Sequence, residues 1–262
     1  FGAGFISVPW HLYLTYGIIV GTGIGLGYNC VLSACPLWLP ERAATATGIL
    51  LMGYALSTAV FGPLLNSLID SIGIISTFKT LAIVCGGGIF LGSFLLKIPS
   101  IEEMNQLPQV DRHEGKQEYN VVTSKMIRKP IFWVYYLVTV LLGGLGLVII
   151  NHCSPILTEG LAVSAAFSAL VISIASISNG VGRVLWGLVY DKFGVIKTLF
   201  LIGACFTIAS VGLFLSYSLN IVFIFIISDC LLMFSYAGNA VTCPSVIRTL
   251  FGHRTFSLHY SV

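Results

Sequence analysis

The chain has 262 residues, of which 56% are hydrophobic and only 9% charged, and its formal net charge is +3. Soluble domains carry about 25% charged residues, so the polar side chains here are too few to cover a soluble fold. The composition therefore excludes a soluble globular domain and predicts an all-α, polytopic membrane protein that contacts the lipid bilayer. The basic residues are scattered and lack interleaved aromatic residues, so no nucleic-acid partner is expected.

Few residue patterns suggest covalent chemistry. The seven cysteines lie in or beside apolar runs, without Cys-x-x-Cys or Cys/His spacing, which argues against zinc and disulfides. The sequence also lacks a nucleophile–base pair, a metal-ligand cluster and a phosphate-binding loop. We therefore expect no metal, no cofactor and no catalytic residue, and we expect that the protein is not an enzyme.

Seven apolar stretches are long enough to cross a bilayer, which takes about 20 residues of helix. They are predicted at residues 12–35, 45–68, 76–98, 130–151, 163–189, 197–216 and 220–243. Residues 1–7 are expected to end a further span, and a polar turn at 244–256 to precede another. The chain is thus expected to be a fragment, truncated at both ends, with about seven complete transmembrane helices.

The basic residues orient these spans. Of the 13 lysines and arginines, eleven lie on one side, in loops or at the ends of spans, only Lys79 lies on the other side, and Arg183 lies within a span. Because cytoplasmic loops carry an excess of lysine and arginine, the loops on the basic side are predicted to be cytoplasmic. These loops are residues 36–44, 99–129, 190–196 and 244–256.

The longest polar stretch, residues 99–129, mixes acids with bases and lacks hydrophobic periodicity. This composition is typical of a solvated linker, and a regulatory docking segment is the alternative. We therefore predict that residues 1–98 are part of an N-terminal helical bundle, that 99–129 are a cytoplasmic linker, and that 130–262 are part of a C-terminal helical bundle.

An internal repeat supports two related halves. Tyr28, Cys35 and Pro36 recur 208 residues later as Tyr236, Cys243 and Pro244. In both copies these residues end a predicted span and precede a basic turn. Parallel repeats of this kind relate the two halves of some transporters.

The most specific motif is the turn from Gly187 to Lys197, which has the spacing G-x-x-x-D-[RK]-x-G-x-x-[RK]. Gly187 permits close helix packing, and Gly194 permits the positive φ that a tight reversal needs. Asp191 is placed to accept hydrogen bonds from the N-terminus of a neighbouring helix, where a carboxylate is favoured. An ordinary polar turn between two spans is the alternative interpretation.

This turn resembles the cytoplasmic loop of transporters of the major facilitator superfamily. The resemblance implies a fold of two bundles of six spans, with parts of both in this chain. It also implies a latch on the cytoplasmic side that controls conformation and contains Gly187, Asp191, Lys192 and Gly194. Val195 and Ile196 depart from the pattern, which often has basic residues at these positions.

Two further stretches narrow the resemblance. Trp38–Gly48 and Ile177–Gly187 are similar to segments of monocarboxylate transporters and oxalate/formate antiporters. By this resemblance Arg42 belongs to the gating elements, and Arg183 pairs with a substrate carboxylate. The resemblance implies secondary active transport of small organic anions, either mono- or dicarboxylates, by alternating access. We expect the plasma membrane rather than an organelle.

The chemistry of Arg183 fits that role. An ionised side chain within a span costs about 2.5–3.5 kcal/mol on insertion scales, so it normally faces a partner, a cavity or a substrate. A guanidinium group stays charged and offers a planar fork that matches a carboxylate. A structural arginine paired with another helix is the alternative. Asn179 stands where proton-coupled monocarboxylate transporters usually have aspartate, which argues against proton coupling at that position.

Asp229 is the other charged residue within a span. It is a candidate for coupling, for pairing with Arg183, or for a structural role among polar neighbours. Four further polar residues are candidates for binding substrate in a cavity, with helix packing as the alternative. They are Tyr28, Asn29, Tyr236 and Asn239.

Two other interpretations of the whole chain stay open. Seven complete spans also suit a receptor-like membrane protein, although the repeat and the Gly187–Lys197 turn argue against it. The chain is alternatively an inactive truncated transporter fragment. The sequence determines neither the substrate nor the oligomeric state.

Overall fold

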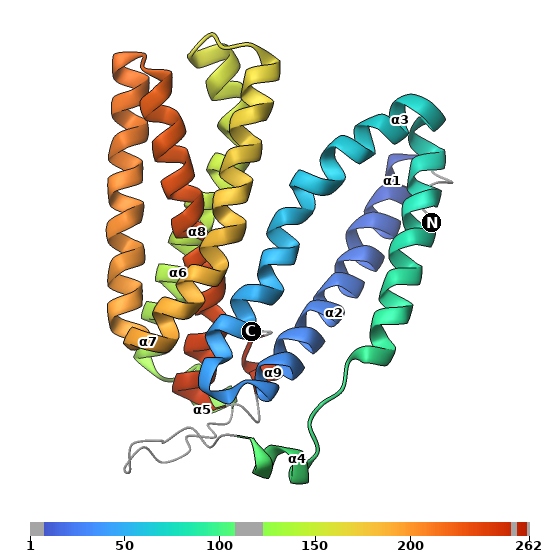
Figure 1. The fold of residues 1–262 in the computed structure, drawn as a ribbon, viewed down its shortest axis with the longest axis vertical. Helices are drawn as coiled ribbons and strands as arrows, with labels where there is room; N and C mark the ends of the chain where they lie inside the picture. Colours follow the sequence, from blue (N-terminus) through green and yellow to red (C-terminus); the bar gives the residue numbers. More distant parts are fainter. Residues whose placement is uncertain (1–7, 108–122, 253–255, 261–262) are drawn as a thin grey trace. The chain divides into compact units, whose positions relative to one another are not determined.

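The computed structural model describes residues 8–107, 123–252 and 256–260, and within these ranges the regular structure is entirely helical (Figure 1). The predicted all-α fold is therefore confirmed. The chain divides into two compact units, Phe1–Trp38 with Val60–Leu107, and Leu39–Ala59 with Pro108–Val262. The predicted division into an N-terminal bundle (1–98), a linker (99–129) and a C-terminal bundle (130–262) stays a prediction. Residues 108–122 of the linker lie outside the described residues.

The first unit consists of the helices before Trp38, the second part of α3, and α4. Its described elements are α1 (Pro9–Leu12), a π-type helix (Tyr13–Val20), α2 (Gly21–Ala34), a 3-10 turn (Cys35–Trp38), α3 from residue 60 to Leu95, and α4 (Ile101–Gln106). The indole Nε1 of Trp38 donates a hydrogen bond of 2.8 Å to the carbonyl oxygen of Lys97. This bond ties the end of the α2 segment to the residues that follow α3.

Helix α4 begins with a capping box. The amide of Glu103 donates to the Ser100 hydroxyl at 3.2 Å, and the Glu103 carboxylate accepts from the Ser100 amide at 2.7 Å. The ammonium group of Lys97 lies 2.8 Å from the same carboxylate. The hydrogen bond from Lys97, followed by those from Ser100, lowers the pKa of Glu103 from 4.5 to about 2.

Two helices are too long for one crossing. Helix α3 (Ala43–Leu95) has 53 residues and α7 (Ala165–Leu219) has 55, so each is about 80 Å of helix against a hydrocarbon core of about 30 Å. Each breaks at one glycine, Gly73 in α3 and Gly194 in α7, both with φ of 76°. Figure 1 shows α7 reversing at its break. The positive φ predicted for Gly194 is thus observed, between the two spans expected there.

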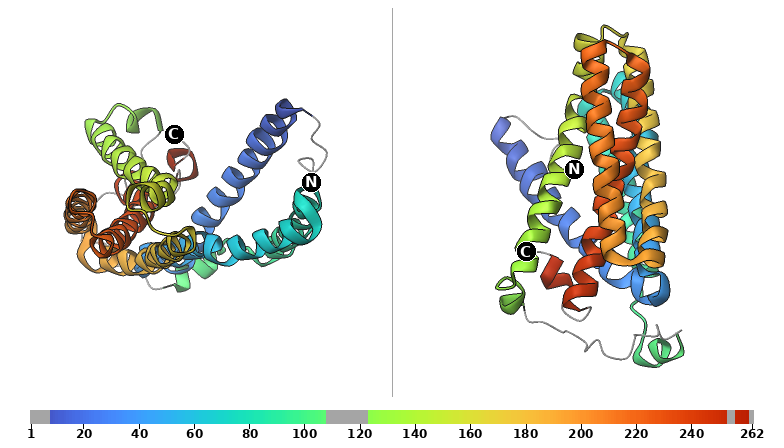
Figure 2. Two further views of the ribbon diagram at one scale, coloured as in Figure 1. Left: turned by 90° about the horizontal axis from the view of Figure 1, so that it is seen from above. Right: turned by 90° about the vertical axis from the view of Figure 1, so that its left-hand side faces the viewer.

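The second unit contains the site described below. Its described elements are a 3-10 turn (Pro40–Arg42), the start of α3, α5 (Thr123–Met126), α6 (Pro130–Pro155), a π-type turn (Ile156–Gly160), α7, α8 (Val222–Phe251) and α9 (Phe256–Tyr260). Helix α8 packs against both parts of α7 and against α6, and the side view shows α7 and α8 next to each other (Figure 2).

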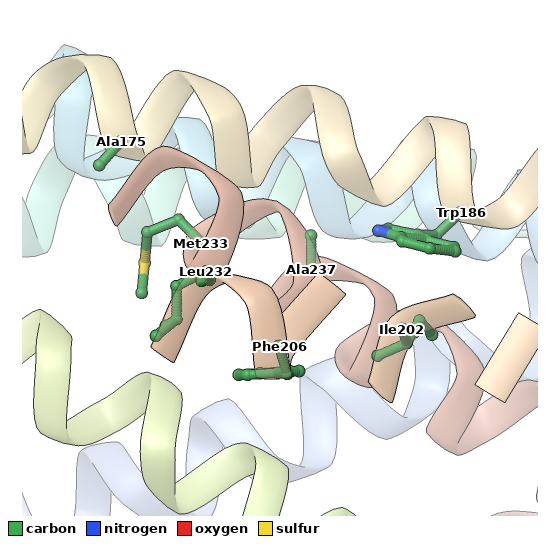
Figure 3. Packing of buried hydrophobic residues seen from close by; sticks show 8 residues of the cluster. Ala175, Trp186, Ile202, Phe206, Leu232, Met233 and Ala237 are labelled. Carbon is green, nitrogen blue, oxygen red and sulfur yellow. The ribbon is translucent and has the colours of Figure 1, made fainter. Parts of the chain in front are cut away.

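The core of this unit joins α8 to both parts of α7. Trp186 comes from the first part of α7, Ile202 and Phe206 come from the second, and Leu232 and Ala237 come from α8 (Figure 3). Small residues let the helices approach closely, as is common between membrane helices. The buried face of α8 is therefore set by helix-to-helix packing, and it leads directly to the cavity.

Most other helix faces are apolar and exposed. Leu95 is 86% exposed and Ile196 is 84% exposed, which suits contact with lipid and not with water. Five of the described helices are long and apolar enough to cross a membrane. They are Tyr13–Trp38, Ser67–Leu95, Pro130–Gly160, Ala165–Leu219 and Val222–Phe251. The chain is a multi-pass integral membrane protein, as predicted.

One predicted boundary is wrong. The sequence placed a polar turn at residues 244–256, but α8 continues through Pro244 to Phe251. Proline removes a backbone donor, but the helix continues through it, and nearby hydroxyl groups donate to carbonyl oxygens one turn earlier on the same helix. Ser245 donates to the carbonyl of Val241 at 2.9 Å, and Thr249 donates to that of Ser245 at 2.8 Å. The hydroxyl residues that suggested a turn therefore bond back to the backbone of a helix.

Candidate functional site

Arg183 lies inside the second unit and is held from two helices. Its side chain is on α7 and is only 4% exposed. Nη1 donates a hydrogen bond of 2.7 Å to the carbonyl oxygen of Leu51 on α3, and Nε donates one of 3.4 Å to Oδ1 of Asn179. The guanidinium carbon lies 5.7 Å from the ring centroid of Tyr54. These contacts fix a permanent charge within the helical bundle.

The backbones of α3 and α7 approach closely at this point. A Cβ atom built on Gly48 would lie 2.9 Å from the carbonyl carbon of Arg183, so no larger residue fits there without moving the two helices apart. Gly48 was part of the Trp38–Gly48 stretch on which the resemblance depends. Its structural role is to let Leu51 reach Arg183.

Arg183 lines a cavity of about 360 Å³, within the range of small-molecule sites. The walls come from four helices and are mostly apolar. They are Tyr54 and Ala55 of α3, Leu147, Ile149, Ile150 and Cys153 of α6, Ile172, Ala175, Ser176, Asn179 and Arg183 of α7, and Asp229, Met233 and Tyr236 of α8. The cavity thus holds one permanent cation, one carboxyl group and a few neutral polar groups.

Asp229 is the second charged residue of this cavity. Its side chain is 1% exposed, and its Oδ2 accepts a hydrogen bond from Sγ of Cys153 at 3.5 Å. Oδ1 has no hydrogen-bond partner among the residues that the structure describes. A thiol is a weak donor, so this carboxyl group is poorly satisfied for a buried position. Its role in coupling stays a prediction.

The four neutral candidates fall in different places. Tyr236 lines the cavity. Asn239 lies further along α8, where its Nδ2 donates a hydrogen bond of 3.2 Å to the carbonyl oxygen of Thr139 on α6, which is a helix-packing contact. Tyr28 and Asn29 are half-buried on α2 in the first unit. Substrate binding by these residues stays a prediction.

Asp191 caps the N-terminus of α3. Its Oδ1 accepts from the amide of Ala44 at 3.1 Å, and its Oδ2 accepts from the amide and the hydroxyl of Thr45 at 2.8 and 2.5 Å. The first amides of a helix have no partner inside it, and a carboxylate also complements the positive end of the helix dipole. The hydrogen bonds predicted for Asp191 are therefore present.

Gly187 makes the capping contact possible. A Cβ atom there would lie 2.7 Å from both the carbonyl oxygen of Ala44 and Cα of Thr45, so the close packing expected for this glycine is confirmed. Lys192 is exposed, with Nζ 5.3 Å from the ring centroid of Phe193. Arg42 is also exposed and ends the 3-10 turn before α3. Gating by these residues stays a prediction.

Sequence reasoning missed three parts of the site. Leu51 contributes a backbone carbonyl, for which a sequence carries no signal. Tyr54 and Cys153 lie in apolar runs, where no sequence pattern indicates that they line a site. Their spacing on the helices does place them on the faces that meet α7 and α8, but only once the rotation of each helix is known.

The described helices of the second unit form a bundle of membrane length around a cavity that contains a permanent charge, which defines a polytopic membrane protein. Residues 1–256 match the sequence model of the Major Facilitator Superfamily. The chain belongs to this superfamily, as its cytoplasmic-turn motif predicted. Membership supports a carrier and not an enzyme.

Relatives at low identity carry transporter names. The chain is 28% identical over 255 residues to the uncharacterized MFS-type transporter YhjX of Escherichia coli. This alignment covers 96% of the present chain and 60% of YhjX. It is 27% identical over 260 residues to the oxalate:formate antiporter of Oxalobacter formigenes, covering 94% of this chain and 56% of that protein. It is 26% identical over 210 residues to human monocarboxylate transporter 10, and this alignment covers 76% of the present chain and 39% of that protein. The chain therefore spans little more than half of its first two relatives.

Proposed function

We propose that the protein is a secondary active transporter of small organic anions, mono- or dicarboxylates, and that Arg183 binds the substrate carboxylate. The observation that carries this proposal is a permanent cation, 4% exposed, on the wall of a cavity between four helices. Such a charge within a membrane bundle is costly and usually functional. The names of two relatives, an oxalate:formate antiporter and a monocarboxylate transporter, support a carboxylate as the ligand.

The same residues suggest how substrate binding reaches the gate. Helix α3 is held by α7 at successive points, through Arg183 to Leu51 and through Asp191 to Ala44 and Thr45. A carboxylate at Arg183 competes with the Leu51 carbonyl for the guanidinium, because both are hydrogen-bond acceptors. Binding therefore loosens one tie between α3 and α7, and Asp191 controls whether the remaining tie opens. This is our proposal for alternating access in the cytoplasmic half.

Asp229 is proposed as the coupling residue. Ser178 of α7 donates a hydrogen bond of 2.8 Å from its hydroxyl to the carbonyl oxygen of Cys230, the residue after Asp229 on α8. Asp229 therefore lies beside Ser178, which is five residues, or about 7 Å along α7, from Arg183. A buried carboxylate with a weak thiol donor is neutralised most simply by a proton. We infer that this proton travels with the anion, so that the charge in the cavity changes little during transport.

Uptake of labelled carboxylates by the purified full-length protein in proteoliposomes tests the transport proposal. We expect saturable uptake of at least one short mono- or dicarboxylate, with alkalinisation of the medium as each anion enters. Asp229→Asn should abolish the alkalinisation. Uptake without any proton movement in the wild-type protein would refute the coupling role of Asp229 alone. A complete lack of carboxylate uptake and exchange would refute transport.

The plasma membrane is the proposed location. Seven spans would also suit a receptor-like protein, but the superfamily match over residues 1–256 favours a transporter. A ligand response without substrate flux would favour the receptor.

A further inference from the structure

The ring of Tyr236 rests directly on Gly146. A Cβ atom built on Gly146 would lie 2.6 Å from Cγ and 2.7 Å from Cε2 of that ring, distances that packed carbon atoms do not tolerate. Gly146 is buried on α6, and Tyr236 lies on α8 and lines the cavity. The missing side chain of Gly146 therefore provides the space into which the tyrosine ring recedes.

Hydrogen bonds join α6 to α8 on either side of this contact. Toward one end, Asn239 of α8 donates to the Thr139 carbonyl of α6 at 3.2 Å. Toward the other end, Cys153 of α6 donates to Asp229 of α8 at 3.5 Å. An added methyl group at position 146 is therefore accommodated mainly by rotation of the Tyr236 side chain. Because the ring is part of the cavity wall, that rotation narrows the cavity.

We propose that Gly146 is a positioning residue for Tyr236 and thereby sets the size of the carboxylate that the cavity accepts. The inference rests on the proposed carboxylate site at Arg183. The charged end of the substrate lies at the guanidinium, and its hydrocarbon part lies against the Tyr236 ring and the apolar wall of α6. Gly146 touches no substrate and acts only through the ring.

Gly146→Ala is the test, and Gly144→Ala is its matched control. The control adds the same methyl group two residues away on the same helix, at a position where a Cβ would have nothing within 4 Å. Binding is measured as thermal stabilisation of the purified full-length protein by straight-chain monocarboxylates of one to six carbons. One extra or missing methylene group in an apolar pocket changes discrimination by about 10–200-fold. We therefore expect Gly146→Ala to weaken the longest acids by tenfold or more relative to the shortest, and Gly144→Ala to leave the profile unchanged.

A second variant separates positioning from damage to the fold. Tyr236→Leu removes the ring, so it should admit longer acids, and Gly146→Ala in that background should no longer narrow the profile. The melting temperatures of the four unliganded proteins, wild type, both single variants and the double variant, form a cycle that needs no substrate. Gly146→Ala should lower stability only when Tyr236 is present.

The outcomes distinguish the two proposals. If the wild-type protein binds no carboxylate, the proposed function fails, while the stability cycle still decides whether Gly146 positions the ring. If the wild type binds carboxylates and Gly146→Ala weakens all chain lengths equally, or has the same effect with and without Tyr236, the positioning role of Gly146 is wrong.

Discussion

Replacing Arg183 with lysine tests the candidate binding residue most directly. Lysine keeps the positive charge but offers a point charge in place of a planar fork. A hydrogen bond to a charged partner contributes about 1.5–3 kcal/mol, so losing one of two prongs should weaken carboxylate binding by about 10–150-fold. Arg183→Ala also removes the charge and should abolish transport.

The assay is substrate-induced thermal stabilisation of purified wild type and Arg183→Lys over a range of carboxylate concentrations. The unliganded melting temperature must be recorded too, because Arg183 also donates to the Leu51 carbonyl at 2.7 Å. Arg128→Lys makes the same substitution at an exposed arginine that does not line the cavity, and it serves as the control, with no expected change in affinity. If the lysine variant is folded and gains the same stabilisation at the same concentrations, Arg183 does not contact substrate.

Three further predictions concern the gate, the linker and the orientation. Asp191→Asn leaves one side-chain oxygen in place of two, so it keeps only part of the cap on Ala44 and Thr45. Losing a helix cap costs about 0.5–2 kcal/mol, which should depress maximal transport several-fold and leave substrate affinity within about threefold. A large affinity loss at normal turnover would exclude a gating role. The pKa of Glu103 is lowered from 4.5 to about 2, so its capping contacts stabilise α4 above pH 4.5 and are lost as the pH falls toward 2. The fluorescence of a variant with Trp38 as its sole tryptophan should report this loss, and the same variant with Glu103→Gln should show no change over this pH range. A single cysteine at Gln106, which is exposed, should react with an impermeant reagent only from the cytoplasm, and labelling from outside would reverse the topology.

The sequence was sufficient for features that depend on local patterns. Apolar stretches of membrane length predicted the helices, and the glycine within the Gly187–Lys197 turn predicted the positive φ at Gly194. Asp191 was predicted to accept hydrogen bonds from a neighbouring helix because a carboxylate is favoured at a helix N-terminus. Pro244 misled the prediction, because proline and nearby hydroxyl residues suit both a turn and the interior of a membrane helix.

The parts of the site that depend on helix rotation could not be predicted. Cys153 meets Asp229 only because α6 and α8 present these faces to each other, and an apolar helix exposed to lipid gives a weak periodic signal. The tie between Arg183 and Leu51 is harder still, since its acceptor is a backbone atom available at every residue. Gly48 is the one sequence mark of that tie, because only glycine lets the two backbones come close enough. In this bundle, the close contact at Gly48 marks the place where the buried charge of Arg183 finds its backbone partner.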